Sequence, residues 1–221
     1  MHVAVANPPT PRRAMHVRRF PPEVLDPEEV RALLDACNPR SLPGRRNRAL
    51  LAFLYRTGLR IREALEVRPK DLDLDRGEAV GAAGGAVRVL FAKGGRSRTV
   101  GIDAGGVTEV AAWQFVRARV ASVAVPAWPP FAPVFCSVHG NRLTAAYVRR
   151  LLPRLARRAG IAKRVHAHGL RHTHAAELRA EGFDIGIISK QLGHASIATT
   201  ARYLDHIAPW AVVEAVGRRE W

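Results

Sequence analysis

The sequence predicts a mostly helical α+β domain with one small antiparallel sheet. Apolar residues recur at helical spacing through most of the chain, whereas between Leu72 and Ile102 they alternate with polar residues, which is typical of strands. A length of 221 residues suits one full domain, or two small ones at most. It is also enough to bury a sizeable core.

The N-terminal region divides into a tail and a first helix. Residues 1–24 are rich in proline and arginine and have neither helical nor strand period, so we predict a flexible basic tail. Asp26 can then cap a helix, Pro27 suits its first position, and Glu29 can complete a capping box. The pattern predicts a helix from this point to about Ala36.

Two further helices are predicted on either side of a glycine. Leucine and phenylalanine recur at helical spacing over residues 47–57, and Gly58 can end that helix in the left-handed conformation. The next helix begins at Leu59. A helix N-terminus beside the Arg60 guanidinium can hold a phosphate, because free backbone N–H groups and the fork of donors can point the same way. Glu63 can orient a nearby cation, and the alternative for both side chains is simple solvation.

A period of two indicates the strands of a small sheet. Apolar residues alternate over 72–75, 87–91 and 99–102, and the tip between the last two segments is Lys93-Gly94-Gly95-Arg96. Such a tip can carry a lysine into a groove, where its ammonium group could give a proton to a leaving oxygen. A solvated turn lysine is the alternative.

The second half of the chain is predicted to be mainly helical. Residues 107–122 have the spacing of an amphipathic helix that carries Trp113 and Phe115. The segment Val134 to Cys136 predicts a short strand, and residues 139–142 predict a turn.

A basic helical stretch follows, from a Thr144 cap to near Gly160. Pro153 lies inside it, which predicts a kink or two short helices. Leucine and alanine separate its arginines, so we expect a basic face that contacts a nucleic-acid backbone, with a merely solvated face as the alternative. These arginines are Arg149, Arg150, Arg154, Arg157 and Arg158.

The composition points to a polyanionic partner. Lys+Arg 35 against Asp+Glu 19 gives a formal net charge of +16, and nucleic acid is the most frequent partner of so basic a chain. An arginine-biased but merely soluble surface is the alternative. Cys37 and Cys136 are far apart and lack metal-type spacing, which predicts a reduced intracellular protein without disulfides. No signal peptide or membrane span is apparent.

Many of the side chains that could act as a base, a nucleophile or an anion ligand lie between His166 and His206. Six of the nine histidines fall here, together with an arginine set among leucines and a tyrosine. Such polar heads make a poor core, because each needs a partner or water. The residues expected to supply the packing are Leu170, Ala175, Ala176, Leu178, Phe183, Ile185, Ile188 and Leu192. The side chains left to face a ligand, most simply an anion, are Arg171, His168, His194 and Tyr203.

Five motifs occur in order along the chain. They are Thr57-Gly58-Leu59-Arg60, the Lys93 hairpin, His168-Gly169-Leu170-Arg171-His172-Thr173, Leu192-Gly193-His194 and Thr199-Thr200-Ala201-Arg202-Tyr203. As a set they resemble the catalytic domain of the tyrosine recombinases, or phage integrases. The intervals of 23 positions from Arg171 to His194 and nine from His194 to Tyr203 are also similar to the family's pattern. The resemblance covers residues 25–206, which we take as the domain.

The resemblance implies a reaction on DNA. Tyr203 would attack a scissile phosphate, giving a 3′-phosphotyrosine and a free 5′-hydroxyl, with His168 as the base. Arg60 and Arg171 would clamp the non-bridging oxygens. His194 would add a hydrogen bond there, and Lys93 would protonate the departing 5′-oxygen.

The resemblance also implies supporting residues and partners. Glu63 and His172 would support the catalytic set, and Arg96 would contact DNA together with Arg149, Arg150, Arg154 and Arg157. Because arginines neutralise the phosphate charge, no metal or nucleotide cofactor is implied. The implied partner is double-stranded DNA, bound by a homo-oligomer (a tetramer) with an accessory DNA-bending protein. We expect a cytoplasmic, nucleoid-associated protein without membrane contact.

The chain departs from the family's pattern in two respects, and its C-terminal segment has a counterpart in relatives. Full-length members usually carry a helical core-binding domain ahead of the catalytic one, where this sequence has a short tail. His174 and Glu177 stand where many relatives carry Phe and His, and Glu177 could repel a nearby phosphate. Residues 207–221 are predicted to form a tail or helix. In relatives a comparable segment docks on a neighbouring protomer, so Trp210 and Trp221 are candidate anchors, or else they cover their own core.

Three rival interpretations stay open from the sequence. A metalloenzyme could use His168, His172 and His194 as ligands, although the nearby cations would oppose a metal. A catalytically silent DNA-binding member would share the basic surface. A type IB topoisomerase would share the tyrosine chemistry, although the motif spacing is more similar to that of a recombinase.

Overall fold

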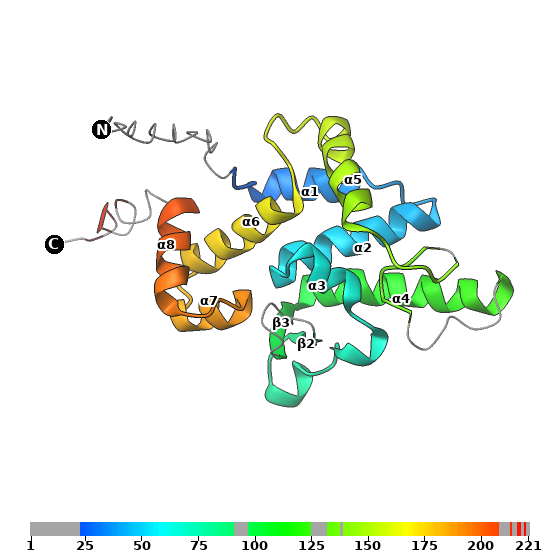
Figure 1. Cartoon of the computed structure of the whole chain (residues 1–221), viewed down its shortest axis with the longest axis horizontal. Helices are drawn as coiled ribbons and strands as arrows, with labels where there is room; N and C mark the ends of the chain where they lie inside the picture. Colours follow the sequence, from blue (N-terminus) through cyan, green and yellow to red (C-terminus); the bar gives the residue numbers. More distant parts are fainter. Residues whose placement is uncertain are drawn as a thin grey trace, which may run out of the picture.

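The computed structural model describes residues 23–90, 97–124, 132–137 and 139–207, together with positions 213, 216, 217 and 219. It confirms a mostly helical α+β fold (Figure 1). The helices are α1 (Pro27–Asp35), α2 (Leu42–Thr57), α3 (Ile61–Glu66), α4 (Ala104–Ala124), α5 (Ala145–Arg158), α6 (Ala167–Ala180), α7 (Ile185–Leu192) and α8 (Ile197–Ile207). The strands are β1 (Leu72–Asp73), β2 (Gly84–Val89) and β3 (Arg98–Asp103), and short 3-10 turns occur at Pro69–Asp71 and Glu78–Val80. Most of the predicted tail, residues 1–22, lies outside the described residues, as do Trp210 and Trp221.

Helix α2 forms the centre of the domain. It runs beside α4 across Figure 1, and α6 also packs against it. Its apolar side chains, such as Leu50 and Phe53, belong to one large core that includes residues of α1, α4, α5 and the sheet. A second, smaller core joins α6, α7 and α8 through Ala175, Ile188 and Leu204. The candidate site lies where these two groups of helices meet.

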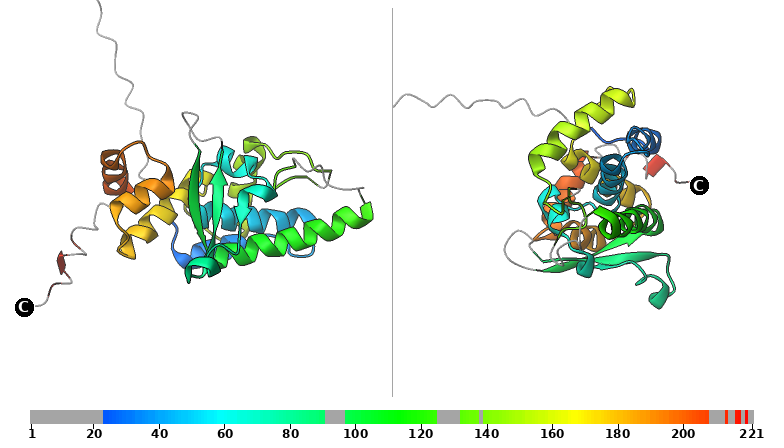
Figure 2. Two further views of the ribbon diagram at one scale, coloured as in Figure 1. Left: turned by 90° about the horizontal axis from the view of Figure 1, so that it is seen from below. Right: turned by 90° about the vertical axis from the view of Figure 1, so that its right-hand side faces the viewer.

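The sheet confirms the predicted antiparallel hairpin. The strands pair in the order β1-β2-β3, and Val87 lies opposite Val100. Burial alternates along β3, so that Val100 and Ile102 face the core, and Figure 2 shows the sheet lying alongside α4. The hairpin tip, residues 91–96, lies outside the described residues and includes both Lys93 and Arg96.

Local capping signals mark one helix start and one helix end correctly, and a second predicted helix start was wrong. The capping box of Asp26 and Glu29 is present, and Gly58 ends α2 with φ 61°, as predicted. The predicted start of α2 at Asn47 was wrong, because the helix begins at Leu42. The cause is the Ser41 side chain, which accepts a hydrogen bond from the backbone N–H of Gly44 and starts the helix within a stretch of polar residues.

Two predictions in the second half of the chain can be compared with the structure. Of the two alternatives predicted at Pro153, a kink or two short helices, the second was wrong, because α5 continues through Pro153 as one helix. Pro153 is exposed, so the carbonyl that it leaves without a helical partner can bond to water. Instead of a strand at Val134–Cys136, the structure forms one isolated bridge between Cys136 and Arg142 around the predicted turn.

Aromatic residues divide between core and surface. Trp113 on α4 is buried and donates to the carbonyl of Val134, whereas Phe115 is 65% exposed. Phe183, which was expected in the core, is 42% exposed. Among the described residues, no helix combines the length and apolarity needed to cross a membrane.

Candidate active site

Helix α6 carries three of the predicted site residues along one side. His166 caps the helix, because its Nδ1 accepts a 2.8 Å hydrogen bond from the backbone N–H of Gly169. His168, Arg171 and His172 then follow at helical spacings of three and four, which places their side chains together. The rings of His168 and His172 lie 4.4 Å apart in an edge contact.

Arg171 is the most deeply buried charge of the site, at 1% exposure. Its Nη1 donates to the carbonyl of Gly58 at 2.6 Å, and its Nη2 donates to the carbonyl of Leu192 at 2.6 Å. These carbonyls lie at the ends of α2 and α7, where a cation is favourable. Burial lowers the pKa of Arg171 to about 10, so the guanidinium stays charged at neutral pH. Arg171 therefore ties two helices together, and its predicted role in binding an external anion stays a prediction.

His194 lies against the same guanidinium. Its Nε2 is 3.1 Å from Nη2 of Arg171, and its Nδ1 is 2.9 Å from the hydroxyl of Thr200. Since arginine can only donate, Nε2 accepts and the proton is assigned to Nδ1. Burial, followed by the charges of Arg171, Arg60 and Arg98, lowers the pKa of His194 to about 4. The ring is thus neutral at pH 7.

Helix α8 brings Tyr203 into this cluster. Its ring stacks on His172 with centroids 5.1 Å apart, and it makes edge contacts with His194 at 5.1 Å and with His168 at 6.4 Å. The hydroxyl is buried and has no hydrogen-bond partner among the described residues. Burial raises the pKa of Tyr203 to about 12, although the charge of Arg171, the approach of its guanidinium to the phenol oxygen and the charge of Arg60 oppose the shift. A phenol with this pKa needs a base in order to act as a nucleophile.

A carboxylate anchors the other arginine. Arg60 is the N-cap of α3, and both its backbone N–H and its Nη1 donate to Glu63 at 3.0 and 3.1 Å. Arg98 adds a two-pronged contact to the same carboxylate at 3.0 and 2.9 Å. Burial alone would raise the pKa of Glu63, but the hydrogen bonds from Arg98 and Arg60 outweigh it and lower that pKa. Glu63 therefore orients two cations, as the sequence suggested for one.

Arg98 is the residue that the sequence analysis missed. A signal was present, because strand alternation places Arg98 on the same face as the core residues Val100 and Ile102. A cation on a buried face needs an acid, and Glu63 supplies it.

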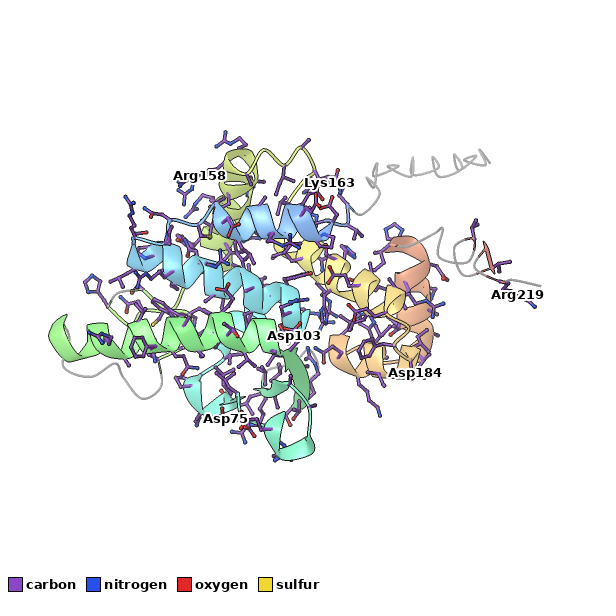
Figure 3. All side chains as sticks on the ribbon, turned by 180° about the vertical axis from the view of Figure 1, so that it is seen from behind. Asp75, Asp103, Arg158, Lys163, Asp184 and Arg219 are labelled. Atoms are coloured by element: carbon purple, nitrogen blue, oxygen red, sulfur yellow. The ribbon has the colours of Figure 1, made fainter. Side chains whose placement is uncertain are left out.

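Other predicted residues take no part in the contacts of Tyr203 and Arg171 given above. The basic-face arginines Arg149, Arg150, Arg154 and Arg157 are exposed along α5. Figure 3 labels Arg158 at the end of that helix, with Asp184 at the start of α7. Glu177 accepts a 2.6 Å hydrogen bond from the Tyr55 hydroxyl. It also lines a cavity of about 510 Å³ between the sheet and α6–α7, together with Phe183 and Ile187.

A metal site built from histidines was a possibility that the sequence left open. Within the ranges that the structure describes, no three His, Cys, Asp or Glu side chains are grouped so that they could hold a metal ion. Instead the two imidazoles nearest Tyr203 pack against its ring.

Comparison with known proteins identifies the family to which the domain belongs. The sequence model of the Phage integrase family matches residues 23–208. The chain belongs to the phage integrase family. The chain is 33% identical over 199 residues to tyrosine recombinase XerC of Myxococcus xanthus, covering 89% of this chain and 63% of that protein. Tyrosine recombinase XerD of Bifidobacterium longum is 32% identical over 200 residues, covering 87% of this chain and 61% of that relative.

Solved structures of the phage integrase family share the fold. The crystal structure of XerA recombinase has a TM-score of 0.73 at 27% identity and covers 92% of this chain and 68% of its own. XerH site-specific recombinase, bound to a palindromic difH substrate after cleavage, has a TM-score of 0.70 at 27% identity, covering 90% and 54%. This phage integrase family member thus spans less than two thirds of the length of XerC and XerD.

Proposed function

We propose that this chain is the catalytic part of a site-specific DNA recombinase, which cleaves and rejoins strands through a 3′-phosphotyrosine. The observation that carries the proposal is the position of Tyr203. Its ring contacts His172 and His194, and His194 in turn contacts the Arg171 guanidinium. A buried phenol beside charged donors is suited to attack phosphorus and poorly suited to a purely structural role, because its hydroxyl has no partner among the described residues.

The proposed reaction is a transesterification. The oxygen of Tyr203 forms a bond to phosphorus, and the bond from phosphorus to the 5′-oxygen breaks. The phenolic proton goes to His168, whose pKa is lowered by burial and by Arg171, so the imidazole is neutral and can accept it. Lys93 gives its proton to the departing 5′-oxygen. Reversal with a different 5′-hydroxyl joins a new strand.

Arg60, Arg171 and His194 stabilise the transition state in this proposal. Arg171 and His194 contact each other in the structure, so a phosphate oxygen competes for the shared Nη2 donor. In this proposal the neutral His194 ring donates to the same oxygens as its Nε2–H tautomer, in which Nδ1 accepts a hydrogen bond from the Thr200 hydroxyl. Arg60 supplies donors from the start of α3.

DNA contacts and assembly complete the proposal. We assign backbone contacts to Arg96 and to the exposed arginines of α5, on a domain of residues 25–206 with 1–24 as a basic tail. Segment 207–221 docks on a neighbouring protomer within a tetramer on double-stranded DNA. Val213 and Val216 support this role because they are 63% and 59% exposed. XerH is a relative that was crystallised with its DNA substrate.

The test is a covalent trap. A DNA duplex with a nick close to the cleavage point loses its short 5′-hydroxyl fragment, so the tyrosyl intermediate accumulates and migrates as a protein–DNA adduct. We expect adduct from wild type, none from Tyr203→Phe, and adduct from the matched control Tyr147→Phe. DNA binding by wild type without any adduct, over a pool of nicked sequences, would instead support a catalytically silent member of the family.

A further inference from the structure

Arg98 occupies the junction of three parts of the candidate site. It begins β3, so it belongs to the stem of the hairpin that carries Lys93. Its guanidinium forms a two-pronged ion pair with Glu63 on α3, at 2.9 and 3.0 Å. A β-carbon added to Gly193 would lie 2.6 Å from both Cζ and Nε of Arg98, so the group also rests on the turn before His194.

The ion pair with Arg98 limits the acceptor capacity that the Glu63 carboxylate can offer to Arg60. Arg98 donates to both carboxylate oxygens, whereas the Arg60 side chain reaches only one of them, through Nη1. The Arg98 side chain is 14% exposed against 35% for Arg60, so Arg98 is the inner partner and Arg60 the outer one. With Arg98 present, most of the Arg60 fork is therefore available for an external anion.

We propose that Arg98 is a positioning residue that keeps Arg60 free to bind the scissile phosphate by occupying the Glu63 carboxylate. Without Arg98, Glu63 has one cationic neighbour instead of two, and the Arg60 fork turns onto the carboxylate as a two-pronged pair. The proposal rests on the proposed strand-cleavage function. Arg98 does not itself touch DNA in this scheme, so its effect passes through Glu63.

This role makes an unusual prediction for a double variant. Arg98→Ala alone should slow adduct formation on the nicked duplex by about 100-fold, since Arg60 is misdirected. Adding Glu63→Gln removes the competing charge and should restore about tenfold of that loss, which is a non-additive result. A purely structural role for the ion pair predicts that the second substitution leaves the rate unchanged or lowers it further.

The measurement is the single-turnover rate of adduct formation at saturating DNA, because a folding defect lowers the adduct yield whereas misdirected Arg60 lowers the rate. Arg88→Ala on the neighbouring strand is the matched control, since Arg88 is an exposed arginine that also pairs with an acid, Asp71. Its rate should equal that of wild type. A wild-type rate for Arg98→Ala, or no recovery in the double variant, overturns the positioning role. Absence of adduct from wild type overturns the strand-cleavage function instead.

Discussion

The side-chain amide of Gln191 pairs with the backbone of Gly101 as a neighbouring strand would. Its Oε1 accepts from the Gly101 N–H at 2.9 Å, and its Nε2 donates to the Gly101 carbonyl at 2.9 Å. Nε2 also donates to the carbonyl of Thr57 at 3.1 Å. One residue of α7 thus fixes the outer edge of β3 and the end of α2, three residues before His194.

Replacing Gln191 by leucine should loosen this junction. The change leaves two carbonyls and one N–H without their protein partner, and because water can reach the Gly101 groups the free energy of unfolding should fall by about 1 kcal/mol. Urea unfolding at neutral pH measures the loss. Gln114→Leu, at a half-buried position of α4, is the control and should change stability by less than about 0.5 kcal/mol. Equal effects of the two substitutions would contradict the assigned role.

The contact between Gly193 and Arg98 can be isolated with a pair of glycines. Gly193 has φ 65° and Gly160 has φ 71°, so alanine at either position bears similar backbone strain. A β-carbon at Gly160 meets nothing within 4 Å, whereas one at Gly193 meets the Arg98 guanidinium. We expect both alanine variants to lose about 1 kcal/mol of stability from strain, and Gly193→Ala alone to slow adduct formation. Equal adduct rates for the two variants would show that displacing Arg98 is harmless.

A buried arginine without an acid offers a stabilising substitution. Arg46 is 5% exposed and donates to Asn47 Oδ1, the Tyr147 hydroxyl and the Cys136 carbonyl, all neutral acceptors. Asn47→Asp should raise the free energy of unfolding at pH 7 by about 1 kcal/mol, because the hydrogen bond becomes charge-assisted. Arg46 would hold the new carboxyl pKa below its unfolded value, so the gain should disappear as pH falls through that range.

Urea unfolding at pH 7 and at low pH tests this sign. The exposed Asn141→Asp is the control, for which no gain is expected. A loss of stability in Asn47→Asp at pH 7 would mean that desolvation of the carboxylate exceeds the gain from the pair.

The buried histidines should make the fold sensitive to acid. Burial is the main cause that lowers the pKa of His172 to about 3, and of His174 and His194 to about 4. In the unfolded chain these groups take up protons near their ordinary pKa of 6.5, so the unfolded state binds more protons between that pH and about pH 4. The free energy of unfolding should therefore fall by about 5–6 kcal/mol from pH 7 to pH 5, which is about 2 kcal/mol for each histidine.

His174 gives a specific test of this acid sensitivity. Its Nε2 is buried without a hydrogen-bond partner among the described residues, and its ring packs against Gly58. His174→Phe should reduce the fall in the free energy of unfolding between pH 7 and pH 5 by about 2 kcal/mol, because one proton-binding difference is removed. His139→Phe, at an exposed turn, is the comparison. A pH profile of unfolding that is the same for His174→Phe and wild type would contradict the assignment.

Local patterns were sufficient for much of the fold. The Asp26 capping box, the Gly58 terminus and the pairing of β2 with β3 depend on neighbours within a few residues or on strand period, and all three were predicted. The start of α2 was not, since a serine cap in a polar stretch has no apolar period to mark it.

The sequence predicted which residues belong to the site better than it predicted how their side chains are held. The sequence placed Arg171, His194 and Tyr203 in one set, but it could not show that two backbone carbonyls hold Arg171, because Gly58 and Leu192 reach it only through the packing of three helices. Arg98 escaped notice for a different reason. Its partner Glu63 lies 35 positions away, and the alternation along β3 was the one sequence signal that placed the Arg98 side chain on the inner face of the sheet.

The two carbonyl contacts of Arg171 have a consequence for the evolution of the family. The residue that would neutralise the phosphorane also fastens α2, α6 and α7, so discarding it injures the scaffold as well as the chemistry. Among the described residues, the Tyr203 hydroxyl makes no comparable hydrogen bond. A lineage that abandons strand exchange yet retains the architecture should therefore shed the phenolic oxygen early and the guanidinium last.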